Sequence, residues 1–152
     1  MFNLKTGKGS FKGFIGECMF KLNNRKVIMT TFFNKLKYID VFGNYFNKEQ
    51  KTFLLRNWHS FDAIEIVSEK GITTFVLYEI KTRNHYHNPS WYKPKMTFRT
   101  HNLYNQSKLI GFTPKIVHVW LYDNWDYDIK ITDFEGRYYC IDKEKKYDYR
   151  VG

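Results

Sequence analysis

A carboxylate and an ammonium group lie two residues apart near the end of an apolar segment, in Glu79-Ile80-Lys81. In an extended strand, alternate side chains point to the same face, so Glu79 and Lys81 are neighbours about 6.6 Å apart along the strand. The same face carries Phe75 and Leu77. A carboxylate in such a position can bind a hard metal ion, and an ammonium beside it can orient or deprotonate a water molecule.

Asp62 begins the preceding apolar segment, and the turn-forming residues between the two segments predict a β-hairpin. The expected strands are residues 61–67 and 72–82, joined by a turn at 68–71. This four-residue turn would place Asp62 opposite Leu77 and diagonal to Glu79, and a six-residue turn would place it directly opposite Glu79. Either register brings two carboxylates together, where a bridging Mg²⁺, or Mn²⁺ in its place, would relieve their repulsion.

Two carboxylates with a bound metal and a neighbouring lysine are suited to phosphodiester hydrolysis. The carboxylates would hold the ion, and Lys81 would position the attacking water and stabilise charge on the phosphate. The alternative is an ordinary surface salt-bridge cluster, because Glu-x-Lys tripeptides are abundant.

The segments 61–66 and 78–82, Phe-Asp-Ala-Ile-Glu-Ile and Tyr-Glu-Ile-Lys-Thr, resemble the PD-(D/E)xK nuclease superfamily. That superfamily includes type II restriction endonucleases, archaeal Holliday-junction resolvases and phage resolving enzymes. Phe61 stands where a proline usually precedes the aspartate. The resemblance covers about residues 11–122 and implies a restriction endonuclease-like core. It further implies that the metal is bound by Asp62, Glu79 and the carbonyl of Ile80, and that Lys81 serves the hydrolytic water.

Members of this superfamily often add an acidic residue from the first helix, and Glu17 resembles that residue. The alternative for Glu17 is a pair with Lys21 one helical turn later, worth roughly 0.2–0.5 kcal/mol. A polar residue of the helix that follows the Glu-x-Lys strand can also face the site, and Gln106 and Lys108 fit that position.

The chain has 152 residues and a formal net charge of +10, which favours a polyanionic partner. The side chains expected to contact nucleic acid are Lys12, Lys21, Arg83, Lys93, Lys95, Arg99, Gln106 and Lys108. His85 and His87 could form a metal-binding pair, but without an evident third ligand a solvated or phosphate-facing role is favoured. Glu65 lies on the opposite face from Asp62, so we expect it to be exposed and outside the metal site.

Hydrophobic periodicity predicts a mixed α/β domain over residues 1–152, with a central mixed sheet flanked by helices. Expected helices cover 11–22, capped by Ser10, and 98–110. Expected closing strands cover 115–122, 127–132 and 137–141, with one or two strands in 27–58 and a basic loop at 83–97.

The first predicted helix has an apolar stripe formed by Phe11, Ile15, Cys18 and Leu22, with Gly13 and Gly16 on the opposite side. Two cysteines, Cys18 and Cys140, are too few and too far apart for a disulfide framework or a zinc site, so we expect buried thiols.

Taken together, these patterns predict an Mg²⁺-dependent endonuclease acting on DNA, either structure-specific like a junction resolvase or restriction- or repair-like. The alternatives are a nucleic-acid-binding protein without activity and an RNA-directed nuclease of the same fold. Without a long apolar segment or a signal-like N-terminus, we expect an intracellular protein, in the cytoplasm of its own cell or of an infected host. A homodimer would suit cleavage of two strands.

Overall fold

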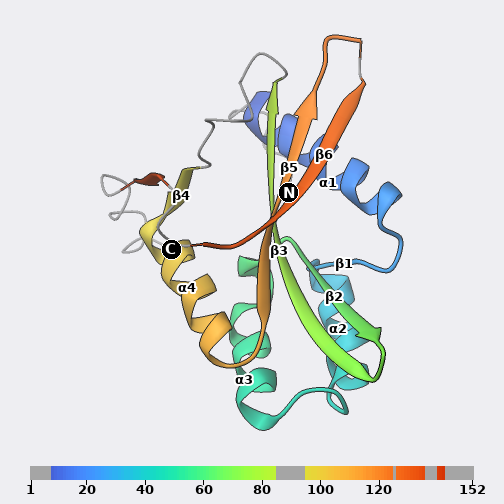
Figure 1. Cartoon of the computed structure of the whole chain (residues 1–152), viewed down its shortest axis with the longest axis vertical. Helices are drawn as coiled ribbons and strands as arrows, with labels where there is room; N and C mark the ends of the chain where they lie inside the picture. The colour runs from blue at the N-terminus through green and yellow to red at the C-terminus, as the bar shows by residue number, and fades with distance from the viewer. Residues whose placement is uncertain (1–7, 85–94, 125, 136–139, 143–152) are drawn as a thin grey trace.

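The computed structural model describes residues 8–84, 95–124, 126–135 and 140–142. Its helices are α1 (Lys8–Asn23), α2 (Phe32–Phe42), α3 (Lys48–Asn57) and α4 (Phe98–Leu109), with a 3-10 turn at Trp58–Ser60. Its strands are β1 (Ile28–Met29), β2 (Ala63–Glu69), β3 (Ile72–Asn84), β4 (Lys95–Thr97), β5 (Thr113–Leu121), β6 (Tyr127–Asp133) and β7 (Cys140–Asp142). Helices flank a mixed sheet (Figure 1), which confirms the expected α/β class, while the restriction endonuclease-like core stays a prediction.

The larger sheet has five strands in the order β1-β2-β3-β5-β6. The β2–β3 and β5–β6 pairs are antiparallel, whereas β3 and β5 run parallel. A parallel pair needs a crossover connection, and α4 lies in the segment that makes it. β4 and β7 form a separate two-stranded sheet. The strand that carries Glu79 and Lys81 is therefore the central strand of the larger sheet.

A two-residue turn joins β2 to β3. Lys70 and Gly71 both have positive φ, 51° and 78°, as in the type I′ turns that match the twist of a hairpin. The four-residue turn expected at 68–71 is therefore wrong, because nothing in the sequence marks Lys70 for a left-handed conformation. Ala63 pairs with Tyr78, which is the second of the two registers considered, and Asp62 lies one residue before the paired part of β2.

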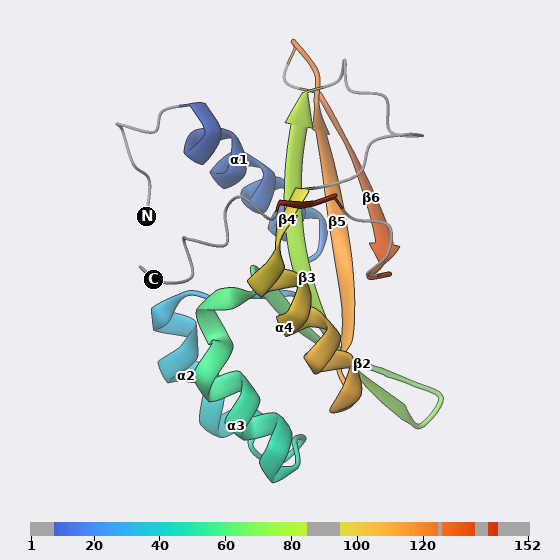
Figure 2. The same cartoon turned by 90° about the vertical axis from the view of Figure 1, so that its left-hand side faces the viewer.

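The two faces of the sheet carry separate cores. On one face Leu77 packs with Phe53 of α3 and Tyr104 of α4, and on the other Tyr78 packs with Phe20 of α1. This alternation confirms the expected division of β3 into two faces. Figure 1 shows α4 and α1 on opposite sides of β3 and β5, and Figure 2 shows α2 and α3 together at the end of the molecule below α1.

Helix α1 approaches β3 through a different face from the one expected. Gly16 and Phe20 are buried, and a Cβ atom at Gly16 would lie 1.8 Å from Oγ1 of Thr82. The residues expected on the buried face but found exposed are Phe11, Cys18 and Leu22. The stripe was assigned wrongly because apolar periodicity gives no weight to glycine, whereas the missing side chain is what lets the helix backbone come close to the strand.

Two smaller expectations about α1 are also corrected. The helix begins at Lys8, so Ser10 lies inside its first turn instead of capping it. The Cys18 thiol is exposed and free, not buried. Cys140 lies in β7, and its side chain is outside the described atoms.

The segment 27–58 holds helices α2 and α3 instead of strands, apart from the two residues of β1. Helix α3 has a complete capping box: Gln50 N donates to Asn47 Oδ1 at 2.8 Å, and Asn47 N donates to Gln50 Oε1 at 3.1 Å. The Asn-x-x-Gln pattern at 47–50 was a sequence signal for this helix start. The aromatic and β-branched residues of this segment led to the wrong prediction of strands, because tertiary packing overrides such propensities.

The boundaries of the basic loop at 83–97 are also wrong. Strand β3 continues through Arg83 and Asn84, and residues 95–97 form β4. His85, His87 and Lys93 lie outside the described residues, so the expectations for them stay predictions. The second expected helix is confirmed as α4, which Thr97 caps by accepting a hydrogen bond from Thr100 N. Among the described helices, none has both the length and the apolar content needed to cross a membrane.

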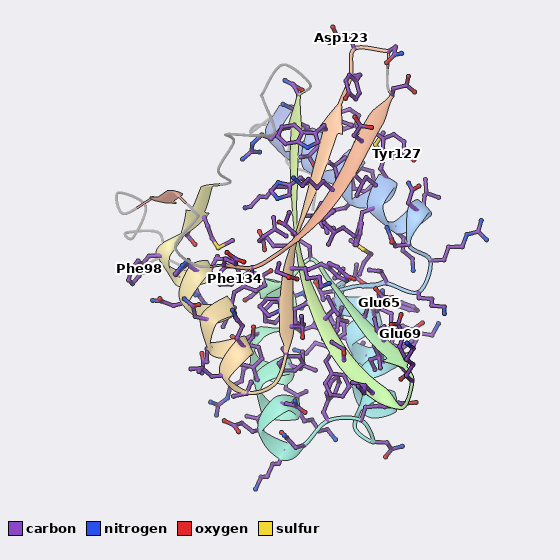
Figure 3. All side chains as sticks on the ribbon, in the orientation of Figure 1. Glu65, Glu69, Phe98, Asp123, Tyr127 and Phe134 are labelled. Atoms are coloured by element: carbon purple, nitrogen blue, oxygen red, sulfur yellow. The ribbon has the colours of Figure 1, made fainter. Side chains whose placement is uncertain are left out.

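Figure 3 places the side chains on this framework. Glu65 and Glu69 lie along the β2–β3 hairpin, and Phe134 lies where the chain leaves β6 beside α4. The ring of Phe134 is 5.4 Å from that of Tyr104, between ring centroids. The end of β6 thereby closes the core around Tyr104.

Candidate functional site

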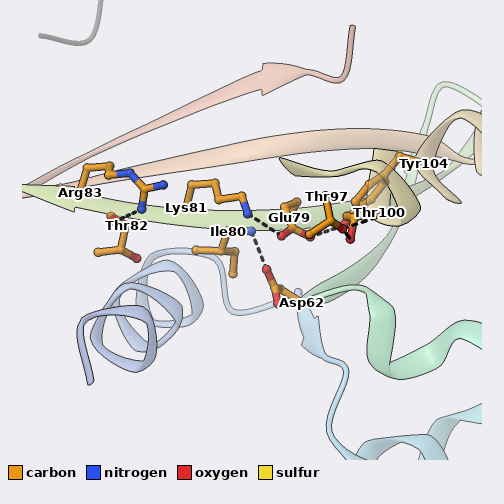
Figure 4. A network of polar contacts seen from close by, with 9 residues as sticks. All are labelled: Asp62, Glu79, Ile80, Lys81, Thr82, Arg83, Thr97, Thr100 and Tyr104. Atoms are coloured by element: carbon orange, nitrogen blue, oxygen red, sulfur yellow. Dashed lines mark hydrogen bonds and ion pairs between the residues drawn. The ribbon is translucent and has the colours of Figure 1, made fainter. Parts of the chain in front are cut away.

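Glu79 on β3 has both carboxylate oxygens engaged (Figure 4). Lys81 Nζ lies 3.1 Å from Oε1, and the Tyr104 hydroxyl donates to Oε2 at 2.7 Å. The side chains of Glu79 and Lys81 are 13% and 21% exposed, so water reaches both. The expected pairing of these two residues by strand period is confirmed by this contact.

Tyr104 is a site residue that sequence reasoning missed. It is fully buried on α4, and burial followed by the charge of Glu79 raises its pKa well above the ordinary value, so the hydroxyl stays a hydrogen-bond donor. Gln106 and Lys108, expected to face the site, do not: Gln106 lines a groove against α3, and Lys108 Nζ lies 3.4 Å from the carbonyl of Phe134. Tyr104 could have been recognised from the sequence, because it lies on the apolar stripe of a predicted helix. A tyrosine hydroxyl that is buried in this way needs a hydrogen-bond partner.

Asp62 is held at the start of β2 by its backbone and its side chain. Its N–H donates to the Tyr78 carbonyl at 3.0 Å, and its carbonyl accepts from Thr30 N at 3.1 Å. Its Oδ2 accepts from Ile80 N at 2.7 Å, which directs the carboxylate toward β3 beside Glu79. The expected role of the Ile80 carbonyl as a metal ligand stays a prediction.

Burial is the main cause that raises the pKa of Asp62 well above its usual range, and the charge of Glu79 raises it further. The Ile80 N–H acts in the opposite direction, because a donor stabilises the anion. Ionisation of the Asp62 carboxyl group is therefore unfavourable in this environment.

Glu17 reaches the same place from α1. Burial, followed by repulsion from Glu79, raises the pKa of Glu17, while an interaction with the Asp62 side chain opposes this rise. These interactions support the expected proximity of Glu17 to the other acids. The alternative, a pair between Glu17 and Lys21, is not found. Lys21 Nζ donates instead to the carbonyl of Arg25, at 2.8 Å, and to that of Val27.

The donor set fits a hard divalent cation by its chemistry, since all the side-chain donors are carboxylate oxygens and a cation would relieve their mutual repulsion. Both oxygens of Glu79 and the Oδ2 of Asp62 are nevertheless engaged with Lys81, Tyr104 and the Ile80 N–H. Within the described ranges, no three His, Cys, Asp or Glu side chains are arranged closely enough to hold a metal ion. Binding of a cation by these acids would require their side chains to move closer together.

No similar protein was found in comparisons with family models, curated proteins and solved structures.

The remaining side chains expected to contact nucleic acid are scattered over the molecule. Lys12 is half-buried on α1, and Arg99 is exposed on α4, on the other side of the sheet. Arg83 lies on the same strand as Lys81, and its guanidinium donates to the Thr82 carbonyl at 2.9 Å. Lys95 lies in β4. Of this group, Arg83 is the one that shares β3 with Glu79 and Lys81.

Glu65 lies on the opposite face of β2 from the acidic cluster, as expected, but it is half-buried and not exposed. It accepts a hydrogen bond from the Tyr78 hydroxyl at 2.7 Å. Burial and this bond raise the pKa of Tyr78. Glu65 therefore has a structural partner of its own.

A second row of polar residues continues from Lys81 across the sheet. In the register Lys81 pairs with His118 of β5, and His118 pairs with Lys130 of β6. Burial, followed by the charges of Lys130 and Arg83, lowers the pKa of His118 to about 4, so its ring is neutral at pH 7. This face of β3, β5 and β6 thus extends the positive side of the site, a feature that sequence reasoning did not identify.

Proposed function

We propose that this protein is an Mg²⁺-dependent endonuclease that hydrolyses phosphodiester bonds in DNA. The observation that supports it best is that Asp62 and Glu17 both interact with Glu79, the acid that pairs with Lys81. Burial and repulsion from Glu79 disfavour the ionisation of Asp62 and Glu17, and such arrangements are found preferentially at functional sites.

In this proposal Asp62 and Glu79 would hold the metal ion, supported by Glu17 and the Ile80 carbonyl. When bound, the ion supplies charge neutralisation at the phosphate and lowers the pKa of a water molecule. Lys81, 3.1 Å from Glu79, is placed to orient the attacking water or to stabilise charge on a phosphate oxygen. Water attacks phosphorus, the bond to the leaving oxygen breaks, and that oxygen takes up a proton.

Tyr104 has a positioning role. Its hydrogen bond to Oε2 fixes the direction of the Glu79 carboxylate and leaves Oε1 as the oxygen that exchanges partners. Because the hydroxyl is buried, water cannot replace it. Glu79 would therefore be presented in one orientation.

The experiment incubates the purified protein with supercoiled, linear, single-stranded and four-way-junction DNA, and with RNA, in Mg²⁺ or EDTA. Lys81→Ala and Glu79→Gln should abolish cutting, whereas the matched control Glu65→Gln, a glutamate on the opposite face, should retain it. Thermal unfolding of each variant checks folding.

Absence of Mg²⁺-dependent cutting of every substrate, or cutting that survives both site substitutions, would overturn the proposal. Binding without cutting would indicate a nucleic-acid-binding protein, and cutting of RNA alone would indicate an RNA-directed nuclease.

A further inference from the structure

A cleft of about 790 Å³ opens directly beside the acidic cluster. Its lining includes Asp62 and Glu17 together with Phe14 and Leu22 of α1 and Phe32 at the start of α2. This volume lies within the range of roughly 300–1,000 Å³ that is common for ligand sites. The cleft therefore borders two of the proposed metal ligands.

The walls of this cleft are apolar yet open to water. Phe14, Leu22 and Phe32 are 57%, 74% and 65% exposed. The ring of Phe32 stacks on His59, with centroids 6.4 Å apart and planes 16° from parallel. A large exposed ring supported by a second ring is suited to stacking against another planar group.

The charged residues that line the cleft limit the kinds of ligand that it could bind. The carboxylates of Asp62 and Glu17 would repel a free anion, and the apolar walls give a phosphate no cations beyond Lys21, whose ammonium donates to two backbone carbonyls. A nucleobase is planar, uncharged and joined through its sugar to a phosphate. A nucleic-acid strand whose phosphate lay at the proposed metal site could therefore place a base in the cleft.

We propose that this cleft takes one unpaired nucleobase of the substrate strand, stacked on Phe32. The inference rests on the proposed nuclease function and narrows it. In a duplex the base faces are covered by their neighbours, so a base can enter such a cleft only from a single strand, a flap, a junction or a flipped-out position. The favoured substrates are nucleic acids with an unpaired base beside the cleaved phosphate.

The test measures binding in EDTA, where cutting does not occur, with a single-stranded oligonucleotide that carries the fluorescent base 2-aminopurine and with its duplex. The wild-type protein should bind the single strand more tightly and quench its fluorescence. Phe32→Ala should lose the quenching and weaken single-strand binding about 5- to 150-fold, as expected for one base–aromatic stack. Phe32→Tyr should restore both.

The matched control is Phe33→Ala, which removes the neighbouring phenylalanine of α2, 73% exposed and absent from the cleft lining. It should leave quenching and affinity unchanged. Unchanged quenching and affinity with Phe32→Ala, or an absence of single-strand preference in the wild type, would overturn the inference. Equal losses with Phe32→Ala and Phe33→Ala would also overturn it, and light scattering would then show whether the apolar surface joins two copies.

The outcomes separate the two proposals. If the stack is present in EDTA but Mg²⁺ produces no cutting, the nuclease function fails and the base site stands. If cutting depends on Lys81 but Phe32→Ala binds normally, only the base site fails.

Discussion

Glu79 makes the ionisation of the neighbouring Asp62 and Glu17 less favourable. The pKa values of Asp62 and Glu17 are both raised, with burial as the first cause and Glu79 as the second. Such a site is stabilised by a proton or by a cation. Its residues are therefore expected to lower the stability of the metal-free protein, as is common for functional sites.

The substitution Asp62→Asn should raise the unfolding free energy of the metal-free protein at pH 7. It removes one buried negative charge, while the amide oxygen can still accept from Ile80 N. In EDTA the variant should melt at a higher temperature than the wild type. Added Mg²⁺ should raise the melting temperature of the wild type but not of the variant, and a destabilised variant in EDTA would contradict the electrostatic account.

Tyr104→Phe should cost about 1–3 kcal/mol, because Oε2 of Glu79 loses its donor in a place that is only 13% exposed. Denaturant titration measures this loss. If Glu79 serves the metal, the variant should also show a lower rate of cutting. The control is Tyr45→Phe, at a tyrosine that is 55% exposed, and an equal loss there would show that the effect is not specific to the Glu79 contact.

His118 makes stability depend on pH. Its pKa is lowered from 6.5 to about 4 by burial and by Lys130 and Arg83. Between these pH values the unfolded chain binds a proton that the folded chain does not, so folding stability falls as the pH falls through this window. His118→Gln should show a smaller loss between pH 7 and pH 5 in denaturant titrations, whereas replacement of the exposed His59 by Gln should leave the loss unchanged.

At the scale of elements, α1 and β3 are joined by a close backbone approach. Phe20 of α1 packs in the core of that face with Tyr78 and Ile80, and Gly16 lies over Thr82. Because Glu17 is adjacent to Gly16, this contact also sets how far Glu17 reaches toward Asp62. The helix position and the acidic cluster are therefore coupled.

Gly16→Ala should destabilise the protein by about 1–3 kcal/mol, since the new methyl would lie 1.8 Å from Thr82 Oγ1 and α1 would have to move. Gly13→Ala is the matched control on the same helix, with nothing within 4 Å of the added carbon. It should stabilise by about 0.5–1 kcal/mol because alanine favours helix. Similar melting temperatures for the two variants would contradict the packing account.

At the scale of the whole molecule, the net charge of +10 is carried by a fold whose proposed reaction centre is acidic. The row formed by Lys81, His118 and Lys130 runs across three adjacent strands away from the acids. Attraction of a polyanion would therefore come from the basic surface around the proposed reaction centre. The acidic residues of the centre would instead attract a cation.

Nucleic-acid affinity should fall linearly with salt on a logarithmic scale, with a slope of roughly −0.7 per phosphate contacted on a single strand. Titrations in EDTA at several salt concentrations measure the slope. Lys130→Gln should make it shallower, and Lys115→Gln, at a lysine that lies 3.8 Å from Asp133, is the control. Affinity independent of salt would contradict a phosphate-binding surface.

Local periodicity along the chain was sufficient to predict several features. Alternation along β3 placed Glu79 and Lys81 on one face, and the apolar runs on either side of Lys70-Gly71 specified a hairpin. The helix at α4 followed from its periodicity and from Gly111, whose φ of 101° ends it. These features need only neighbours in the chain, so residue order is enough to predict them.

Packing between elements determines which side chains from different elements come into contact. The register of β2 against β3 depended on a left-handed Lys70, and the buried side of α1 depended on Gly16, which has no side chain to reveal it. Tyr104 joined the site because α4 crosses back over the sheet, and the cleft beside Asp62 exists because helix α2 replaced an expected strand. Contacts of this kind arise from packing between distant segments, which one-dimensional periodicity does not encode.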